Sequence, residues 1–256
     1  MLAPLSGIVV PLDQVPDPAF AQRLAGDGLA LEPLDQHVVA PCDARVLHVH
    51  RAGHALTLSA SGLEILIHVG LDTVKLNGKG FDPRVKAGDE VRAGDLMLTF
   101  DADYVATHAR SLITPVLVTN MERVLAMQSR APSLAGSGQT RRVTAGHDVL
   151  LDLRIRAGGP EPSTQSQGER VESAPIEIAS GTGLHARPAA TVAAAARRFT
   201  SEIRLLKGDR EANARSVVSI MTLEVIGGDT VTVVARGADA GPAVAAIVQA
   251  LGSGVA

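Results

Sequence analysis

The sequence predicts two domains of different fold class: an all-β antiparallel sandwich or barrel over residues 1–156, and an α+β sandwich over residues 174–256. Three observations support this prediction. Short apolar runs separated by turn residues fill the first part, apolar residues recur at helical spacing in the second, and a polar segment lies between them. That segment, residues 157–173, is rich in Gly, Pro, Ser, Gln and Glu and has no apolar period, so we expect a flexible linker.

The apolar runs of the first domain predict short antiparallel strands, because each run is bounded by Gly, Pro, Asp or Asn. One short helix is expected at residues 101–111. The expected strands cover residues 7–10, 38–40, 46–49, 63–69, 96–100, 115–118 and 149–155.

In the second domain, apolar residues alternate around residue 177 and then recur at i, i+3, i+4 and i+7 from Ala189 to Ala196. This pattern predicts a strand followed by a helix. Further strands are expected at 203–206 and 231–235, and further helices around 217–221 and 244–251. The order β-α-β-β-α-β-α predicts a compact α+β sandwich.

The composition excludes several classes of function. Lys and Arg number 24 against 27 Asp and Glu, so the chain lacks the basic excess of a nucleic-acid or anionic-membrane binder. Aromatic residues make up only 2%, which disfavours base stacking. The single cysteine, Cys42, excludes an internal disulfide and is expected to be an inert thiol. With no export signal or membrane-spanning segment evident, we expect a cytoplasmic protein.

His185 lies where a helix is expected to begin. It precedes Pro188, and proline suits the first helical turn because its missing N–H would be unpaired there. The backbone N–H groups at a helix N-terminus favour an anion, and Arg187 adds a cation beside them. A phosphoryl group on His185 would be held by the helix N-terminus and by the Arg187 guanidinium. The alternative is a capping histidine beside a surface arginine.

The segments GLHARPAA, RRFTSEI and RSVVSIMTLEV together resemble HPr, the histidine phosphocarrier of the bacterial phosphotransferase system, across residues 174–256. The resemblance implies an open-faced β-sandwich in which Nδ1 of His185 is phosphorylated with the help of Arg187. It also aligns Ser216 with a serine that a regulatory kinase modifies in some relatives. An ordinary helix-capping role explains Ser216 equally well.

Two histidines of the first domain, His54 and His68, are expected in one hairpin. A turn centred on Ser61 would pair them directly, with Cβ atoms about 4.5–5.5 Å apart, whereas a one-residue slip would place them on opposite faces. One imidazole can attack a phosphoryl group while the other donates a hydrogen bond to its oxygens. The same pair could bind Zn²⁺ if a further ligand were present.

The remaining histidines of the first domain are expected at the surface. His48 and His50 alternate with Leu47 and Val49, which predicts that both histidines lie on the solvent face of a strand. Ordinary surface positions are expected for the other three, His37, His108 and His147.

Several segments of the first domain occur in an order that resembles enzyme IIA of the glucose type over about residues 1–155. They are PLSGIVVPLDQVPDPAFAQRLAGDGLALEP, VAPCDARV, GHALTL, ILIHVGLDTVKLNGKGF and TPVLVTN. The resemblance implies an antiparallel β-sandwich in which His68 accepts a phosphoryl group and His54 supports it. Two departures lie beside the site: the His54–His68 interval is one residue shorter than in many relatives, and Ala52 replaces a common Thr.

The two resemblances together predict a fused phosphocarrier of the phosphoenolpyruvate-dependent sugar phosphotransferase system. His185 would receive a phosphoryl group from enzyme I, which acts in trans or follows in a longer chain, and pass it to His68. His68 would pass it to the IIB domain of a IIB/IIC membrane permease for glucose or N-acetylglucosamine. No cofactor or metal is required, and neither nucleic acid nor membrane insertion is expected.

Other functions explain less of the sequence. A regulatory protein whose phosphorylation state reports sugar flux would use the same residues, and loss of sugar uptake on deletion would distinguish transport from it. A biotinyl or lipoyl carrier needs an exposed lysine at a hairpin tip, which Lys75, Lys79 and Lys86 do not convincingly offer. Zinc-dependent hydrolysis lacks a clear third ligand at motif spacing.

Overall fold

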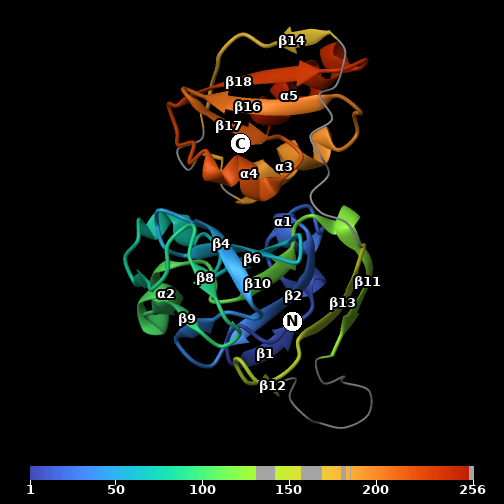
Figure 1. The fold of residues 1–256 in the computed structure, drawn as a ribbon. Helices are drawn as coiled ribbons and strands as arrows, with labels where there is room; N and C mark the ends of the chain where they lie inside the picture. The colour runs from blue at the N-terminus through green and yellow to red at the C-terminus, as the bar shows by residue number, and fades with distance from the viewer. Residues whose placement is uncertain (131–141, 157–168, 180–182, 185, 254–256) are drawn as a thin grey trace. The chain divides into compact units, whose positions relative to one another are not determined.

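A computed structural model describes residues 1–130, 142–156, 169–179, 183–184 and 186–253. The chain divides into two compact units, Met1–Gly158 and Gly159–Ala256. The first unit is built almost entirely of strands, and the second combines strands with three helices (Figure 1). The two predicted fold classes are therefore confirmed.

The first unit contains strands β1 to β13, joined by short helices. The strands are β1 Gly7–Val10, β2 Asp27–Pro33, β3 His37–Val39, β4 Ala44–Val49, β5 Ala55–Ala60, β6 Leu63–His68, β7 Phe81–Pro83, β8 Glu90–Val91, β9 Leu96–Phe100, β10 Thr114–Val118, β11 Val124–Ser129, β12 Arg142–Val143 and β13 Leu151–Ile155. The helices are η1 Leu12–Gln14, α1 Pro18–Ala21, η2 Thr73–Leu76, α2 Ala102–His108 and η3 Met121–Arg123. The helix expected at 101–111 is therefore present as α2, which is shorter than expected.

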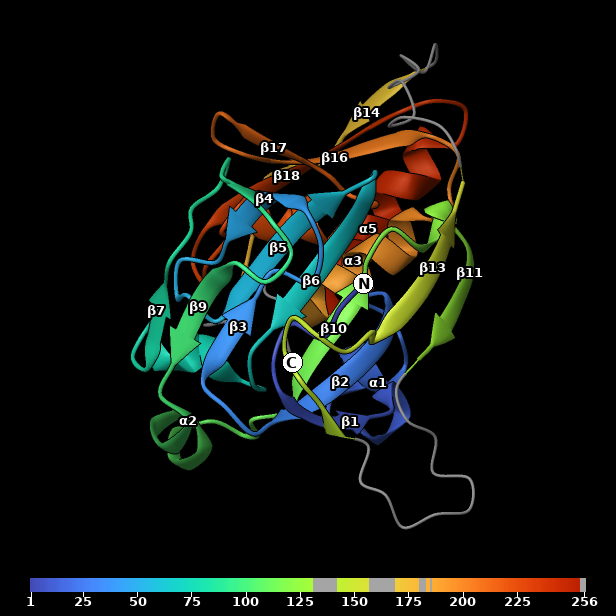
Figure 2. The same ribbon diagram turned by 60° about the horizontal axis from the view of Figure 1, so that its bottom comes forward.

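One eight-stranded antiparallel sheet, in the order β12-β1-β2-β10-β6-β5-β4-β8, forms the body of the first unit (Figure 2). Strands β3, β9 and β7 form a second sheet, and β11 pairs with β13. The apolar runs of β6 and β10 make these strands buried along most or all of their length, whereas β1 alternates. Since β6 lies between β5 and β10, its end is a rigid position for a functional side chain.

The β5–β6 hairpin closes through a two-residue turn. Ser61 and Gly62 both have positive φ, 51° and 79°, the backbone that tight hairpins require. The ladder runs from Ala60 opposite Leu63 to Ala55 opposite His68. The predicted register, with His54 opposite His68, is wrong by one residue, because the hairpin axis passes between Ser61 and Gly62 and not through Ser61.

The second unit is an antiparallel sheet with helices on one face. Its elements are β14 Arg170–Glu172, β15 Ile176–Glu177, α3 Ala186–Ala196, β16 Glu202–Lys207, β17 Arg210–Asn213, α4 Val217–Thr222, β18 Thr230–Arg236 and α5 Ala240–Ser253. The sheet order is β14-β18-β16-β17, and β15 also pairs with β18. From β15 onward the element order is the predicted β-α-β-β-α-β-α.

The last part of the segment expected as a linker, residues 157–173, contains a strand. Residues 170–172 form β14 and pair with β18, so they belong to the sheet of the second unit. The polar side chains of Arg170 and Glu172 are exposed while Val171 is half-buried, so a strand exists here without a strong apolar signal. Residues 157–168 lie outside the described part of the chain.

The core of the second unit depends on small residues of α3. Ala189, Ala190, Ala193 and Ala196 are fully buried, so the helix backbone can approach α5 and α4 closely. Inward-facing residues of β16 and β18 complete this core, among them Leu205.

Among the helices that the structure describes, none is long and apolar enough to cross a membrane.

Asp239, which directly precedes α5, ties that helix to the segment before β16. Its carboxylate accepts hydrogen bonds from the Thr200 N–H at 2.7 Å, the Ser201 N–H at 2.8 Å and both side-chain hydroxyls. The Ser201 hydroxyl and the Thr200 N–H lower the pKa of Asp239 most strongly. The charged form is therefore the one that the fold stabilises.

We expect Asp239→Asn to destabilise the second unit at pH 7, because the amide cannot accept all of these hydrogen bonds. A carboxylate with a lowered pKa stabilises the fold above its unfolded value of about 3.9, and this stabilisation is lost as pH falls through the folded value. The difference from wild type should therefore shrink below about pH 5. Hydrogen-exchange protection of β16 and β18 amides measures it, and a pH-independent difference would contradict the assignment.

Candidate active site

His68 is the last residue of β6, and its imidazole is buried, with 6% of the residue exposed. Its Nδ1 lies 2.8 Å from the carbonyl oxygen of Gly70. Since a carbonyl only accepts hydrogen bonds, Nδ1 carries the proton and Nε2 carries the lone pair. Burial lowers the pKa of His68, which favours the neutral ring at physiological pH. His68 is thus a neutral imidazole whose Nε2 can act as a nucleophile.

The loop after β6 is shaped so that Gly70 can accept this hydrogen bond. Gly70 has a φ of +70°, and a Cβ atom there would lie 2.7 Å from Cγ2 of Thr73 and 2.9 Å from the Ser111 carbonyl oxygen. The Thr73 hydroxyl donates to the Val69 carbonyl at 2.9 Å. Only glycine fits this position, because any side chain would both strain the backbone and collide with its neighbours.

His54 lies against His68, although the register differs from the predicted one. Their ring centroids are 4.7 Å apart with an interplanar angle of 71°, and His54 is 1% exposed. A residue beside Ala55 within a regular strand would face away from His68, but His54 precedes β5 and is not bound by its pleat. The Val69 N–H donates to the His54 carbonyl at 2.8 Å, which holds the two chain segments together.

His50 joins the same cluster, so the prediction of a solvent-facing His48 and His50 is wrong. Strand β4 shifts register after Val46, and the bulged residue Leu47 turns outward. His48 is consequently half-buried, and His50 is only 8% exposed. The His50 ring centroid lies 4.4 Å from that of His54. Alternation alone gives no sign of a bulge, which is why sequence reasoning missed His50.

Two of the four phenylalanines of the chain border the imidazoles. The Phe20 ring lies 5.5 Å from that of His68, and the Phe81 ring lies 6.1 Å from that of His54. Phe20 is held by the short helix α1, whose N-cap Asp17 accepts the Ala19 N–H at 2.9 Å. These apolar rings limit the access of water to the imidazoles, which explains the desolvation of His68.

Carboxylates lie near His68 as well. Burial dominates and lowers the pKa of His68, while the negative charges of Asp17 and Asp72 act in the opposite direction. Asp72 is half-buried, has a left-handed backbone with φ of 60°, and lies 3.5 Å from the Lys75 ammonium. Negative charges therefore lie near His68, although the Lys75 ammonium partly neutralises that of Asp72.

Other predicted residues of the first unit take no part in this cluster. His37, His108 and His147 are exposed, as expected. Cys42 is half-buried, and burial raises the pKa of its thiol, so the thiol form is favoured at neutral pH. Within the described ranges, no group of three or more His, Cys, Asp or Glu side chains is placed to hold a metal ion, so the His54–His68 pair has no third ligand there.

In the second unit, His185 lies outside the described residues. Helix α3 begins at Ala186, directly after His185 in the chain, which agrees with the expected start, and Arg187 is exposed. The preceding loop is anchored, because the Leu184 N–H donates to the Val225 carbonyl at 3.0 Å. A Cβ atom on Gly183 would lie 1.8 Å from that carbonyl oxygen, so glycine is required.

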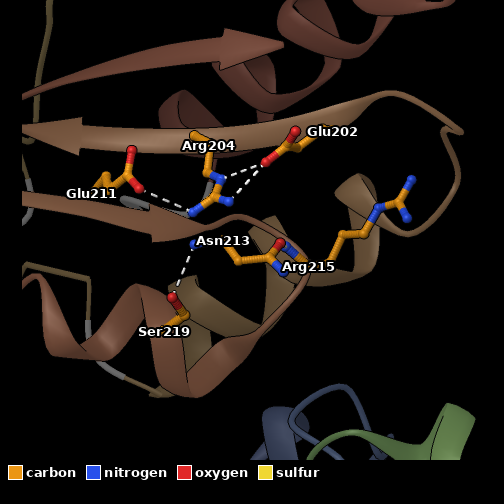
Figure 3. Close-up of polar contacts among 6 residues, drawn as sticks. All are labelled: Glu202, Arg204, Glu211, Asn213, Arg215 and Ser219. Carbon is orange, nitrogen blue, oxygen red and sulfur yellow. Dashed lines mark hydrogen bonds and ion pairs between the residues drawn. The ribbon is translucent and has the colours of Figure 1, made fainter. Parts of the chain in front are cut away.

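Ser216 is the N-cap of α4, and its hydroxyl accepts the Ser219 N–H at 3.1 Å. Ser219 in turn accepts the Asn213 N–H at 2.9 Å (Figure 3), and the Arg215 guanidinium donates to the carbonyls of Phe199 and Ser201. The capping role of Ser216 is therefore present, and its modification by a kinase stays a prediction.

The outer face of the second unit carries paired charges. Arg204 of β16 lies 2.7 Å from a Glu202 carboxylate oxygen and 3.2 Å from one of Glu211 (Figure 3). Because these charges neutralise one another locally, the face presents no strong field of one sign.

Comparison with known families assigns both units. Residues 1–124 match the family model described as phosphoenolpyruvate-dependent sugar phosphotransferase system, EIIA 1. Residues 172–253 match the model described as PTS HPr component phosphorylation site.

Individual proteins are similar to parts of the chain. The chain is 43% identical over 143 residues to the PTS system glucose-specific EIIA component of Halalkalibacterium halodurans, covering 56% of this chain and 83% of that protein. It is similar to the glucose permease IIA structure from Mycoplasma capricolum, with 33% identity, a TM-score of 0.51, and coverage of 59% of this chain and 92% of that one. It is also similar to an HPr structure from Thermoanaerobacter tengcongensis, with 39% identity, a TM-score of 0.31, and coverage of 34% and 94%.

The hydrogen bond to Gly70 predicts the protonation state of His68 in solution. At pH 6 a free imidazole is mostly protonated, whereas we expect a smaller protonated fraction for His68, because burial lowers its pKa, and we expect the neutral ring to carry its proton on Nδ1. Long-range proton–nitrogen NMR correlations of the histidine rings measure both properties. A His68 ring that is protonated at pH 6 to the same extent as a free imidazole, or a neutral ring with its proton on Nε2, would contradict the assignment.

Proposed function

Because the chain belongs to the enzyme IIA family of the phosphoenolpyruvate-dependent sugar phosphotransferase system and carries an HPr component behind it, we propose that His185 passes a phosphoryl group to His68. Both components are phosphocarriers of that system, so the chain is a phosphotransferase-system phosphocarrier with two carrier sites. The observation that carries the proposal is the buried, neutral His68 ring, whose Nδ1 is bound to Gly70 so that Nε2 bears the lone pair.

The transfer between the two histidines is an in-line displacement at phosphorus. Nε2 of His68 attacks, a nitrogen–phosphorus bond forms there, and the bond at His185 breaks with its electron pair returning to the His185 imidazole. The Nδ1 proton of His68 stays on the ring and remains hydrogen-bonded to the Gly70 carbonyl. That carbonyl stabilises the positive charge which the ring gains on phosphorylation. Catalysis is then mostly positioning and charge stabilisation.

His54 supports the phosphoryl group on His68 in this proposal. Its ring lies within 4.7 Å of the His68 ring, centroid to centroid, and an imidazole N–H can donate to a phosphoryl oxygen. A donor fixed in place before the reaction needs no reorganisation as charge moves onto the new phosphoryl site. Burial strengthens this hydrogen bond, because water competes poorly for either partner.

Charge complementarity favours the encounter of the two sites. Arg187 lies two residues after His185 and is exposed, and the negative charges of Asp17 and Asp72 act on His68. Oppositely charged surfaces raise the rate of productive encounters more than they raise affinity.

The partners follow from the two components. EIIA and HPr components imply interaction with enzyme I and with a sugar-specific IIB/IIC permease. We assign phosphorylation of His185 to enzyme I and the onward transfer from His68 to the IIB domain. The glucose-specific relative supports glucose as the class of sugar served.

The relay predicts which sites fill when the full chain receives phosphoenolpyruvate and enzyme I, with no other HPr present. We expect two phosphoryl groups on the wild-type chain, one on His68→Ala and none on His185→Ala, as measured by intact mass. Because His185 supplies His68, loss of His185 should empty both sites. A phosphorylated His185→Ala chain would contradict the order of transfer.

In the same assay, His54→Ala should fill both sites, but phosphorylation of His68 should be about 10²-fold slower, the usual effect of losing one preorganised donor. The exposed His37 of β3 provides a matched control, and His37→Ala should transfer at the wild-type rate. Equal rates in the His54→Ala and wild-type chains would remove His54 from the mechanism.

A further inference from the structure

A third imidazole, that of His50, lies in the site and has no part in the relay from His185 to His68. It follows β4 directly, and its centroid is 4.4 Å from that of His54 with an interplanar angle of 57°. The His54 ring thus has His50 as one neighbour and His68, at 4.7 Å, as another. Its distance to Phe81 is larger, 6.1 Å. Among these rings, His50 lies nearest to His54.

The position of His50 is fixed by its own turn. Its Nδ1 accepts the Ala52 N–H at 3.2 Å, and its backbone N–H donates to the Ala55 carbonyl at 2.9 Å. The Gly53 N–H donates to the His50 carbonyl at 2.6 Å. Because Nδ1 is an acceptor, the neutral ring carries its proton on Nε2. Both the ring plane and the tautomer of His50 are therefore set before any ligand binds.

The contact with His50 bears on the orientation of the His54 ring. His68 ends a central strand and its Nδ1 is bonded to Gly70, so two constraints fix its ring. His54 precedes β5, so the strand pleat does not set the direction of its side chain. A tilted ring pair at 4.4 Å is a favourable aromatic contact and restricts the His54 ring on the side of His50.

We propose that His50 is a positioning residue for phosphoryl transfer, which holds the His54 imidazole against His68. This inference rests on the proposed function, since it assigns His50 a part in the same reaction. The His50 ring restricts the His54 ring, so that the His54 N–H is in place when the phosphoryl group reaches Nε2 of His68. Loss of this support misplaces a donor, and displacements of about 1 Å slow enzymatic steps by up to about 10²-fold.

Two substitutions separate this role from support of the turn alone. His50→Phe keeps an aromatic ring beside His54 but loses the acceptor for the Ala52 N–H. His50→Asn keeps a short side-chain acceptor for that N–H but loses the ring. Positioning through the ring predicts near wild-type transfer for His50→Phe and at least about tenfold slower transfer for His50→Asn and His50→Ala. If His50 acts only by accepting the Ala52 N–H in the turn, transfer should be slow in His50→Phe and near the wild-type rate in His50→Asn.

The experiment follows phosphorylation of His68 in the full chain by rapid quench and intact mass, starting from enzyme I and phosphoenolpyruvate. His37→Ala is the control for loss of an exposed histidine. A second readout is the nuclear Overhauser contact between ring protons of His54 and His68. This contact should persist in His50→Phe and weaken in His50→Asn, which a purely structural role in the turn would not produce.

The outcomes are distinct. Transfer that is slow in His50→Phe and normal in His50→Asn overturns the proposal, as do wild-type rates in all three His50 variants. Far-ultraviolet circular dichroism identifies a variant that fails to fold, and the Phe and Asn variants test the proposal even where the Ala variant is unfolded. If the wild-type chain itself never gains a phosphoryl group on His68, the proposed function has failed instead.

Discussion

The hydrogen bond between Nδ1 of His68 and the Gly70 carbonyl is the interaction on which the site depends. It determines which nitrogen of the imidazole can attack and which nitrogen keeps its proton. The bond exists because β6 ends at His68 within a central position of the large sheet, and because Gly70 adopts a backbone with φ of +70°. A rigid strand and a glycine-dependent turn together therefore fix the chemistry of one side chain.

Burial of the cluster formed by His50, His54 and His68 also fixes the chemistry of His68. Desolvation lowers the pKa of His68 and so keeps the attacking ring neutral, while neighbouring carboxylates oppose this effect only in part. His54 and Phe20 pack against the His68 ring, and His50 and Phe81 pack against the His54 ring. This packing places hydrogen-bond donors in a medium where they act strongly on charge. Burying a polar ring costs free energy, and a hydrogen bond to a ring nitrogen offsets part of that cost. Nδ1 of His50 has such a bond with the Ala52 N–H, and Nδ1 of His68 has one with the Gly70 carbonyl.

Sequence reasoning predicted the two fold classes, the element order of the second unit and the meeting of His54 with His68. It failed where the backbone departs from regular geometry. The Ser61–Gly62 turn shifted the hairpin register by one residue, and the bulge at Leu47 turned His50 inward. Alternation assumes an unbroken pleat, so it cannot locate either feature. Strand β14, which begins the sheet of the second unit at Arg170, was not predicted, because its charged residues give no alternating apolar pattern.

In the proposed transfer, His68 takes the phosphoryl group on Nε2 while Nδ1 remains bonded to the Gly70 carbonyl. Phosphorus–nitrogen coupling in a ¹⁵N-labelled, phosphorylated chain identifies the nitrogen that is bonded to phosphorus. We expect one-bond coupling from phosphorus to Nε2 of His68, with a proton retained on Nδ1. Coupling to Nδ1 of His68, or a phosphoryl group on another histidine of the first unit, would contradict it.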